Sequence, residues 1–304
     1  MCSTASLALR FRSSEELLAF GAAATASGIS VIATVASKWC RFRYKLSRMA
    51  IRPRVHLIVA AEYHDADFVR RELLALLAED ERITAVCTHD FHDTASWMRA
   101  NLLLTYTNNV FPDVAGRDAL RAFLERGGRW FAIHGSAAYT CFKPPAVNIG
   151  GIQLPGLTDT PDLQPDYMNL LGCRFISHLA QQAIRIWPVS EHPIVAGLPP
   201  FEVVDEPYIL ELRGDCEVLL ESRFTGEAPG YVRSPWREDL PRPQMLLHRY
   251  GAGEVVYLAP GHSCGRHDLQ PFIREVPIQP GPWRNETYRE IVRRAIRWGI
   301  ADRP

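Results

Sequence analysis

Short apolar segments alternate with segments of helical periodicity from Arg54 onward, and this alternation constrains the fold more than any other feature of the chain. The segment 55–61 (VHLIVAA) is apolar almost throughout, which is typical of a strand buried on both faces of a sheet. Residues 65–77 follow with apolar side chains at helical spacing. Strands that alternate with helices in this way predict βαβ units, and hence an α/β fold with a mostly parallel sheet.

The alternation continues to residue 133. The segments 83–87 and 102–106 predict the second and third strands, and 130–133 predicts the fourth. A helix is predicted over 118–126, ending at two glycines, because glycine readily adopts the left-handed conformation that follows a helix. Shorter strands and a closing helix are predicted further along, at 183–189, 201–210, 218–220, 244–250, 255–258 and 285–298.

The segment 141–164 interrupts this pattern. It carries Pro144, Pro145, Pro155 and Pro161 as well as glycines, so it is predicted to be a long loop. Loops of that length inside a domain are usually either functional lids or disordered. This one also has the character of an insertion.

The first fifty residues differ in composition from the rest of the chain. Residues 17–39 are apolar and precede the basic run 41–45, which is compatible with a membrane anchor. Their many small and hydroxyl residues insert weakly into membranes, however, and the segment fits a secretory signal poorly. Three interpretations stay open: a poorly ordered extension before a start at Met49, a targeting segment, or an anchor. We expect residues 1–50 to be a poorly ordered or targeting extension, and residues 51–304 to form one domain.

The charge balance narrows the choice of partner. Lysine and arginine total 34, and aspartate and glutamate also total 34. The chain therefore has no net positive field that would attract nucleic acid, and a small molecule or another protein is expected instead. Membrane binding is disfavoured, and a homo-oligomer stays open. Seven scattered cysteines without a C-x-x-C pair favour reduced thiols in a cytoplasmic protein.

The fourth predicted strand ends at His134, in the string WFAIHGSAA. Ligands of parallel sheets bind at the carboxyl ends of the strands, so His134 is a candidate site residue. A plain alternative is a strand-end histidine that is hydrogen-bonded to a neighbouring loop. Hydrolases that carry a nucleophile on the turn after a strand use cysteine or serine there. Because His134 holds this position, with Ser136 and Cys141 only further along, triad hydrolysis is disfavoured.

Four further strings combine histidines, carboxylates and aromatic residues. Taken singly, each has a structural explanation, such as a turn or the end of a strand. Together they resemble, in order and spacing, the ThuA-like family of trehalose-utilisation proteins. The resemblance spans residues 55–299 and rests on Ile133-His134, the L-x-G…F-x-x-H element ending at His178, HP-I-x-x-G-L-P from His192, D-E-x-Y from Asp205 to Tyr208, and Y-G-x-G…G-H ending at His262.

Several positions depart from the family's usual pattern. Gly135-Ser136 stands where alanines are usual, and Ser177 stands where glycine is usual. Glu254 replaces the usual arginine, and Ser263 replaces the usual aspartate. These departures leave the expected fold intact, but they cluster near the expected site and weaken any transfer of a substrate.

The resemblance implies a flavodoxin-like, class I glutamine amidotransferase-like three-layer sandwich and an association with disaccharides and keto-sugar derivatives. We expect acid–base chemistry on such a sugar, because imidazole titrates near neutrality and exchanges protons with hydroxyl groups. Burial is expected to raise the pKa of Glu206 and let it act as acid or base. The expected catalytic residues are His134, Glu206, Tyr208 and His262. The expected substrate-binding residues are His178, His192, Asp205 and Ser136.

Two other interpretations use the same residues. Three histidines and a carboxylate can bind zinc or manganese and polarise a carbonyl group. No H-x-H or H-E-x-x-H spacing supports a metal, so a divalent ion is an open alternative and no cofactor is required. The altered residues near His134 and His262 favour instead a non-catalytic sugar-binding or protein-interaction module of the same fold.

Overall fold

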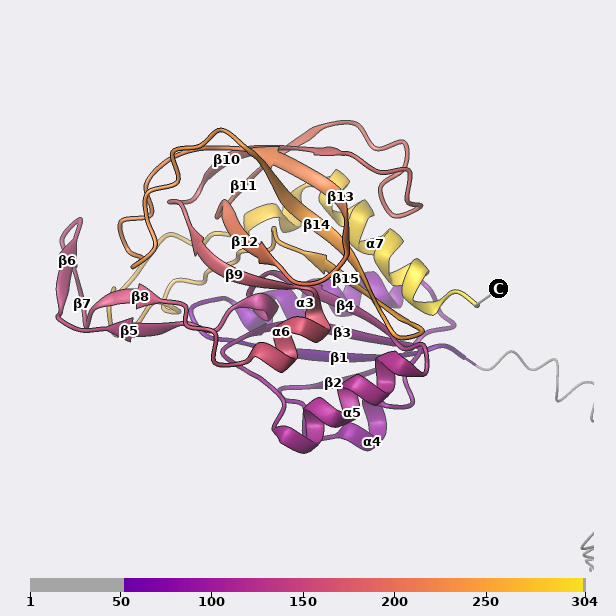
Figure 1. Cartoon of the computed structure of the whole chain (residues 1–304). Helices are drawn as coiled ribbons and strands as arrows, with labels where there is room; N and C mark the ends of the chain where they lie inside the picture. The colour runs from indigo at the N-terminus through magenta and orange to yellow at the C-terminus, as the bar shows by residue number, and fades with distance from the viewer. Residues whose placement is uncertain (1–51, 303–304) are drawn as a thin grey trace, which may run out of the picture. The chain divides into compact units, whose positions relative to one another are not determined.

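Five parallel strands form one half of the central sheet in the computed structural model, which describes residues 52–302 (Figure 1). The four strands predicted up to residue 133 are all present, and a strand from the C-terminal part of the chain joins them. In spatial order the five are β2 (Thr84–Thr88), β1 (Arg54–Ala61), β3 (Leu102–Asn108), β4 (Arg129–Ile133) and β15 (Gly253–Leu258).

In the other half of the sheet, each strand is antiparallel to its neighbours. The order continues from β15 with β14 (Pro241–Tyr250), β13 (Cys216–Arg223), β10 (Gln182–Pro188) and β11 (Phe201–Asp205). Only β14 and β10 of this nine-stranded sheet run against the other strands. The sheet is therefore mostly parallel in direction, and the predicted α/β fold is confirmed.

Helices cover both faces of the sheet and give the predicted three layers. One face is covered by α3 (Ala66–Ala78) and α7 (Glu286–Ile300). The opposite face is covered by α4 (Thr94–Trp97), α5 (Val114–Glu125) and α6 (Pro165–Leu171). Two single turns of 3-10 helix complete the helical elements of residues 52–302, η1 (His134–Ala137) and η2 (Gly281–Arg284).

The first strand shows why both of its faces are buried. Leu57 and Val59 pack in the cluster that contains Leu73 of α3 and Ile291 of α7, whereas Ile58 packs in the cluster on the opposite face. Successive side chains of a strand point to opposite faces, so one continuous apolar segment serves two cores. Burial of each such side chain contributes about 1.5–3 kcal/mol to the stability of the fold.

The helix predicted over 118–126 begins earlier than expected. It starts at Val114 because the Asp113 side chain accepts a hydrogen bond from the Gly116 backbone at 2.7 Å and caps the first turn. The two shorter helices, α4 and α6, were not predicted, because one or two turns are too short to show a helical period.

The single strand predicted at 201–210 is wrong, since the structure has two strands there. The first, β11, belongs to the main sheet, whereas β12 (Tyr208–Leu212) pairs with β9 (Cys173–His178) in a separate two-stranded sheet. Pro207 separates them and has no backbone N–H for a strand ladder, so the chain leaves the main sheet at this point. Glu206 is thereby placed at the crossover, just beyond the carboxyl end of β11.

The segment 141–164 is not the unstructured loop that was predicted. It folds into two narrow ribbons, in which β5 (Cys141–Lys143) pairs with β8 (Leu157–Asp159) and β6 (Val147–Ile149) pairs with β7 (Ile152–Leu154). Figure 1 shows these ribbons projecting from one end of the sheet. Strands of three residues are too short to reveal an alternating pattern in the sequence, which explains the error.

Among residues 52–302, no helix is long and apolar enough to span a membrane. The expectations for residues 1–50, including a targeting segment or anchor, lie outside the described residues.

Candidate functional site

His134 occupies a strained turn at the carboxyl end of β4. The strand ends at Ile133, and His134 opens η1 with a φ angle of 53°. A side chain in this left-handed region costs about 1–2 kcal/mol, so the surrounding structure must enforce it. The next position accepts only glycine without rearrangement, because a Cβ atom on Gly135 would lie 2.6 Å from the Thr107 carbonyl oxygen. Hydrolases place their nucleophilic serine or cysteine on a strained turn of this kind after a strand, whereas this chain has a histidine there.

The imidazole of His134 is fully buried and held on both nitrogens. Its Nδ1 lies 2.8 Å from the Ala259 carbonyl oxygen, which only accepts hydrogen bonds, so Nδ1 carries the proton. Its Nε2 lies 2.9 Å from the Tyr208 hydroxyl and 3.0 Å from Nε2 of His64. The Tyr208 ring stacks on the imidazole at a centroid distance of 4.3 Å. The predicted pair of His134 and Tyr208 is thus in direct contact.

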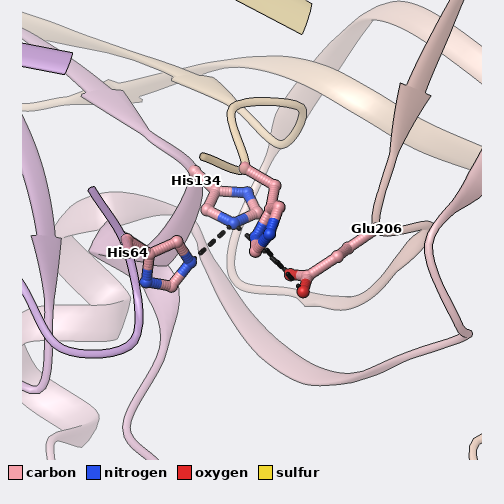
Figure 2. A group of neighbouring side chains, drawn as sticks. His64, His134 and Glu206 are labelled. Carbon is pink, nitrogen blue, oxygen red and sulfur yellow. Dashed lines mark hydrogen bonds and ion pairs between the residues drawn. The ribbon is translucent and has the colours of Figure 1, made fainter. Parts of the chain in front are cut away.

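Glu206 lies at the centre of the site, with its carboxylate between three imidazoles. Oε1 is 3.2 Å from His262 Nδ1 and 3.6 Å from His178 Nε2, and Oε2 is 3.5 Å from His134 Nε2. Figure 2 shows Glu206, His134 and His64 pointing toward one another from separate parts of the fold. The side chain of Glu206 is 15% exposed, so the carboxylate is accessible from the cavity above it.

Asp205 positions the loop that carries His262. Its carboxylate is fully buried and accepts hydrogen bonds from the backbone N–H groups of Gly261 at 2.7 Å and His262 at 3.3 Å. It was predicted to bind substrate, but the structure does not place it in the lining of the cavity. Its contacts instead join the end of β11 to the segment after β15.

The charges in the cluster shift the pKa values in opposite directions. Burial alone raises the pKa of Glu206, but the positive charges of His178 and His262 outweigh it and hold that pKa well below its usual range. Burial disfavours the charged form of His262, yet the Glu206 carboxylate outweighs burial and raises the pKa of His262 to about 9. Burial, with the charges of His134 and His262, lowers the pKa of His64 to about 3.

The raised pKa that the sequence led us to expect for Glu206 is therefore wrong in sign. That expectation considered burial alone, whereas the fold surrounds the carboxylate with imidazoles. Near pH 7 the cluster contains an ionised Glu206, a protonated His262 and a neutral His64.

A cavity of about 400 Å³ opens above this cluster. His64, His178, Glu206, Tyr208 and His262 lie in its floor. Its walls are largely aromatic and aliphatic, with Phe142 and Ile152 from the ribbons and Leu269 and Phe272 from the segment before η2. The rings of Phe142 and Phe272 meet edge to face at 5.1 Å, so the two walls contact each other.

Two residues that were predicted to bind substrate lie elsewhere. His192 is in the turn between β10 and β11, where its Nδ1 accepts a hydrogen bond from the Ile194 backbone at 3.3 Å. Ser136 is buried in η1, and its hydroxyl bonds the backbone of Thr105 and Thr107. Neither residue is in the cavity lining. The contacts of Ser136 support the turn that carries His134, whereas the turn of His192 precedes β11 and so lies at the opposite edge of the sheet from the site.

His64 was missed by the sequence analysis, although it lies in the floor of the cavity. It follows the carboxyl end of β1, just as His134 follows the end of β4. Both strands are parallel neighbours of β3, so their ends meet at one edge of the sheet. A position just after the carboxyl end of a parallel strand identified His134, and the same signal is present at His64.

A G-x-S-x-G spacing was also missed, at Gly261-His262-Ser263-Cys264-Gly265. This pattern marks a nucleophile only on a sharp turn from a strand into a helix. Ser263 is buried in an irregular segment after β15 with no helix following directly, and the turn of that kind belongs to His134. The expectation against triad hydrolysis stays a prediction.

Four of these side chains form a group suited to holding a metal ion. His64, His134, Glu206 and His262 each offer one ligand atom, and the four atoms lie within 4.8 Å of one another. His178, which was part of the predicted histidine set, contacts Glu206 from the other side and is not in this group.

Comparisons with known proteins agree with this architecture. The family model for ThuA, described as trehalose utilisation, matches residues 57–276. A search of curated proteins finds no match. A solved ThuA-like protein from Bacteroides uniformis is similar with a TM-score of 0.57 at 19% identity, covering 84% of this chain and 94% of the other. One from Parabacteroides merdae has a TM-score of 0.52 at 13% identity, covering 83% and 93%. The two structures support the fold alone, whereas the family model covers most of the sequence. The chain belongs to the ThuA family.

Proposed function

We propose that this protein modifies a carbohydrate, or a keto derivative of one, by acid–base chemistry at Glu206 and the histidines around it. The observation that carries the proposal is the position of Glu206. Its carboxylate is ionised, lies within 3.2–3.6 Å of three imidazoles, and is open to the cavity. The family's description as trehalose utilisation supports a sugar as the ligand.

The pair of Glu206 and His262 supplies a base and an acid on the same side of the cavity. Glu206 takes a proton from the carbon next to a sugar carbonyl, and the electrons of the broken C–H bond form a C=C bond. The carbonyl oxygen receives the proton that His262 carries near pH 7, which gives an enediol. Return of a proton to either carbon completes an isomerisation or epimerisation without any oxidant.

The walls of the cavity suit one face of a sugar ring. Its volume of about 400 Å³ lies within the range of roughly 300–1,000 Å³ that is typical of small-molecule sites. Tyr231 and Phe272 offer flat apolar surfaces for the C–H face of a ring, whereas the floor offers hydrogen-bonding groups. Trp187 and Trp236 do not contribute, since neither is in the lining.

The test combines binding with proton exchange. The full chain is screened by thermal shift against mono- and disaccharides and their 3-keto derivatives, because a ligand of the folded state raises its stability. Stabilising ketosugars are then incubated with the protein in D₂O, and deuterium on carbon is followed by NMR. Glu206→Gln is expected to slow the exchange by about 10²–10⁴-fold while binding persists.

Glu217→Gln is the matched control. Glu217 lies near the start of β13, where its carboxylate accepts hydrogen bonds from Ser190 and Arg249, and it does not line the cavity. The control is expected to exchange at the wild-type rate. Exchange that is unchanged in Glu206→Gln would refute the role of the carboxylate. A ketosugar that binds without any exchange would instead identify the protein as the non-catalytic sugar-binding module.

A further inference from the structure

Four potential ligand atoms converge at the floor of the cavity from four separate loops. His64 follows β1, His134 follows β4, Glu206 follows β11 and His262 follows β15. These strands run in the same direction, so all four residues lie at the carboxyl edge of the sheet. Figure 2 shows the side chains of His64, His134 and Glu206 directed at a common point.

The outward nitrogen of each imidazole faces an oxygen that accepts a proton. Nδ1 of His64 contacts the Glu62 carbonyl, Nδ1 of His134 contacts the Ala259 carbonyl at 2.8 Å, and Nε2 of His262 contacts the Gln279 side-chain oxygen at 3.3 Å. In the neutral form of each imidazole the outward nitrogen therefore carries the hydrogen, so the inward nitrogen has a lone pair once any second proton is lost. Histidines that bind metals are held in this way by their second nitrogen.

The inward nitrogens lie too close together for neutral imidazoles alone. His64 Nε2 is 3.0 Å from His134 Nε2, although both atoms present lone pairs. His262 is only 6% exposed, and its inward Nδ1 makes no hydrogen bond of normal geometry, although Glu206 Oε1 is 3.2 Å away. Such an arrangement needs a positive charge between the lone pairs, supplied either by a metal cation or by an extra proton.

We propose that His64, His134, His262 and Glu206 bind one divalent transition-metal ion. Binding would displace the second proton of His262, and the ion would then polarise the sugar carbonyl in place of that proton, with one oxygen of Glu206 left as the base. Metal–nitrogen distances are about 2.1 Å, which places ligands at right angles about 3.0 Å apart and tetrahedral ligands about 3.4 Å apart. The 3.0 Å between His64 Nε2 and His134 Nε2 suits two neighbouring ligands of one ion, and all four ligand atoms lie within 4.8 Å of one another. Three imidazoles and one carboxylate suit zinc, iron, cobalt, nickel or manganese.

An ion held by these four side chains would keep one or two positions for other ligands if it were five- or six-coordinate. His64, Glu206 and His262 line the cavity, so the open positions face it and accept adjacent oxygens of a hydroxyketone or diol. The Tyr208 hydroxyl lies 2.9 Å from His134 Nε2, so an ion on that nitrogen would replace this hydrogen bond and leave the hydroxyl free to bond a ligand oxygen. This sugar-binding part of the inference rests on the proposed function, whereas binding of the ion itself does not.

The experiment measures metal binding without any activity. The full chain is stripped with EDTA, and zinc and cobalt are titrated calorimetrically, with metal content measured by mass spectrometry. We expect one ion per chain with a sub-micromolar Kd, a higher melting temperature, and cobalt d–d bands without thiolate charge transfer. His64→Gln is expected to weaken binding at least 100-fold, with the metal-free melting temperature showing that the variant folds.

His92→Gln is the matched control, because His92 is exposed and lies outside the cavity. Three results would overturn the metal site and leave the extra proton as the explanation. They are equal metal affinity of His64→Gln and His92→Gln, charge-transfer bands from thiolate ligands, and a wild-type protein that binds no ion. Ketosugar exchange in a protein that binds no ion would overturn this inference and keep the proposed function. Tight binding at these residues without any effect of sugars would support the metal site and count against the proposed function.

Discussion

The floor and the walls of the cavity are built on different principles. The floor cluster consists of His64, Glu206 and His262, which line the cavity, and His134, which is fully buried behind them. Each member follows the end of a main-sheet strand, and each imidazole is held by a carbonyl or amide oxygen. The walls come from the short ribbons β5–β8 and from the irregular segment before η2. Wall side chains such as Phe142 and Phe272 contact one another through apolar surfaces.

This difference between floor and walls separates the chemistry of the site from its choice of ligand. Groups that must hold charge in a buried place need a rigid frame, because an unpaired charge there is costly. Apolar walls need only shape, so short ribbons and loops are sufficient. We infer that the floor determines the reaction and that the walls determine which ligand fits.

The largest effect is expected from His134→Asn. Asparagine tolerates the left-handed backbone at this position, so the turn should remain while the imidazole is lost. Turnover of a ketosugar is expected to fall by about 10²–10⁴-fold. Steady-state kinetics, with a thermal melt to establish folding and His92→Asn as control, would check this. Turnover within tenfold of the wild type would show that the strained histidine serves structure alone.

A smaller effect of a different kind is expected from Phe272→Ala in the wall. Loss of this ring removes apolar contact with the ligand worth roughly 1–2 kcal/mol, so KM should rise about tenfold. kcat should stay close to the wild-type value, because the floor cluster is unaltered. Leu240→Ala, at an exposed position away from the lining, is the control. A fall in kcat with unchanged KM would contradict the division between floor and walls.

The smallest effect concerns His56, a buried histidine at which burial outweighs the nearby carboxylate of Asp93. His56 in β1 bonds Ser96 and Thr88, and burial lowers its pKa below 6.5. Above pH 6.5 the neutral form contributes its full stability. As the pH falls below that value, the unfolded chain binds the extra proton, so the free energy of unfolding decreases, by at most about 1.4 kcal/mol per pH unit.

Urea unfolding of wild type and His56→Gln between pH 5 and 8 would measure this slope. We expect the variant to lose less stability than the wild type as the pH is lowered. Parallel curves would show that protonation of His56 does not contribute. His262 is the opposite case, because there the Glu206 carboxylate outweighs burial and raises the pKa to about 9.

The sequence was most informative where a pattern extends over a long segment. The strands up to residue 133 and the closing helix α7 were predicted because apolar residues recur with the period of each element. The ribbons, the helix α6 and the break at Pro207 were missed or misread. Their form depends on short-range geometry and on partners far away in the sequence, as with β9 and β12.

The site shows the same limit. His134, Glu206, Tyr208 and His262 were selected from motifs, and the structure brings these four into one cluster, while their catalytic roles stay predictions. His192 came from an equally distinct motif, yet it supports a turn. A motif identifies a residue that matters without telling whether it shapes the backbone or faces the cavity.

The sequence alone determined the α/β fold, the ThuA family and most of the side chains that meet at the floor, because these follow from periodicity and from motifs of fixed spacing. Only the tertiary structure brought His64 into the cluster and reversed the expected pKa shift of Glu206. The physical reason is that charge and metal affinity depend on distances between side chains. Folding sets those distances between residues as far apart in the chain as His64 and His262.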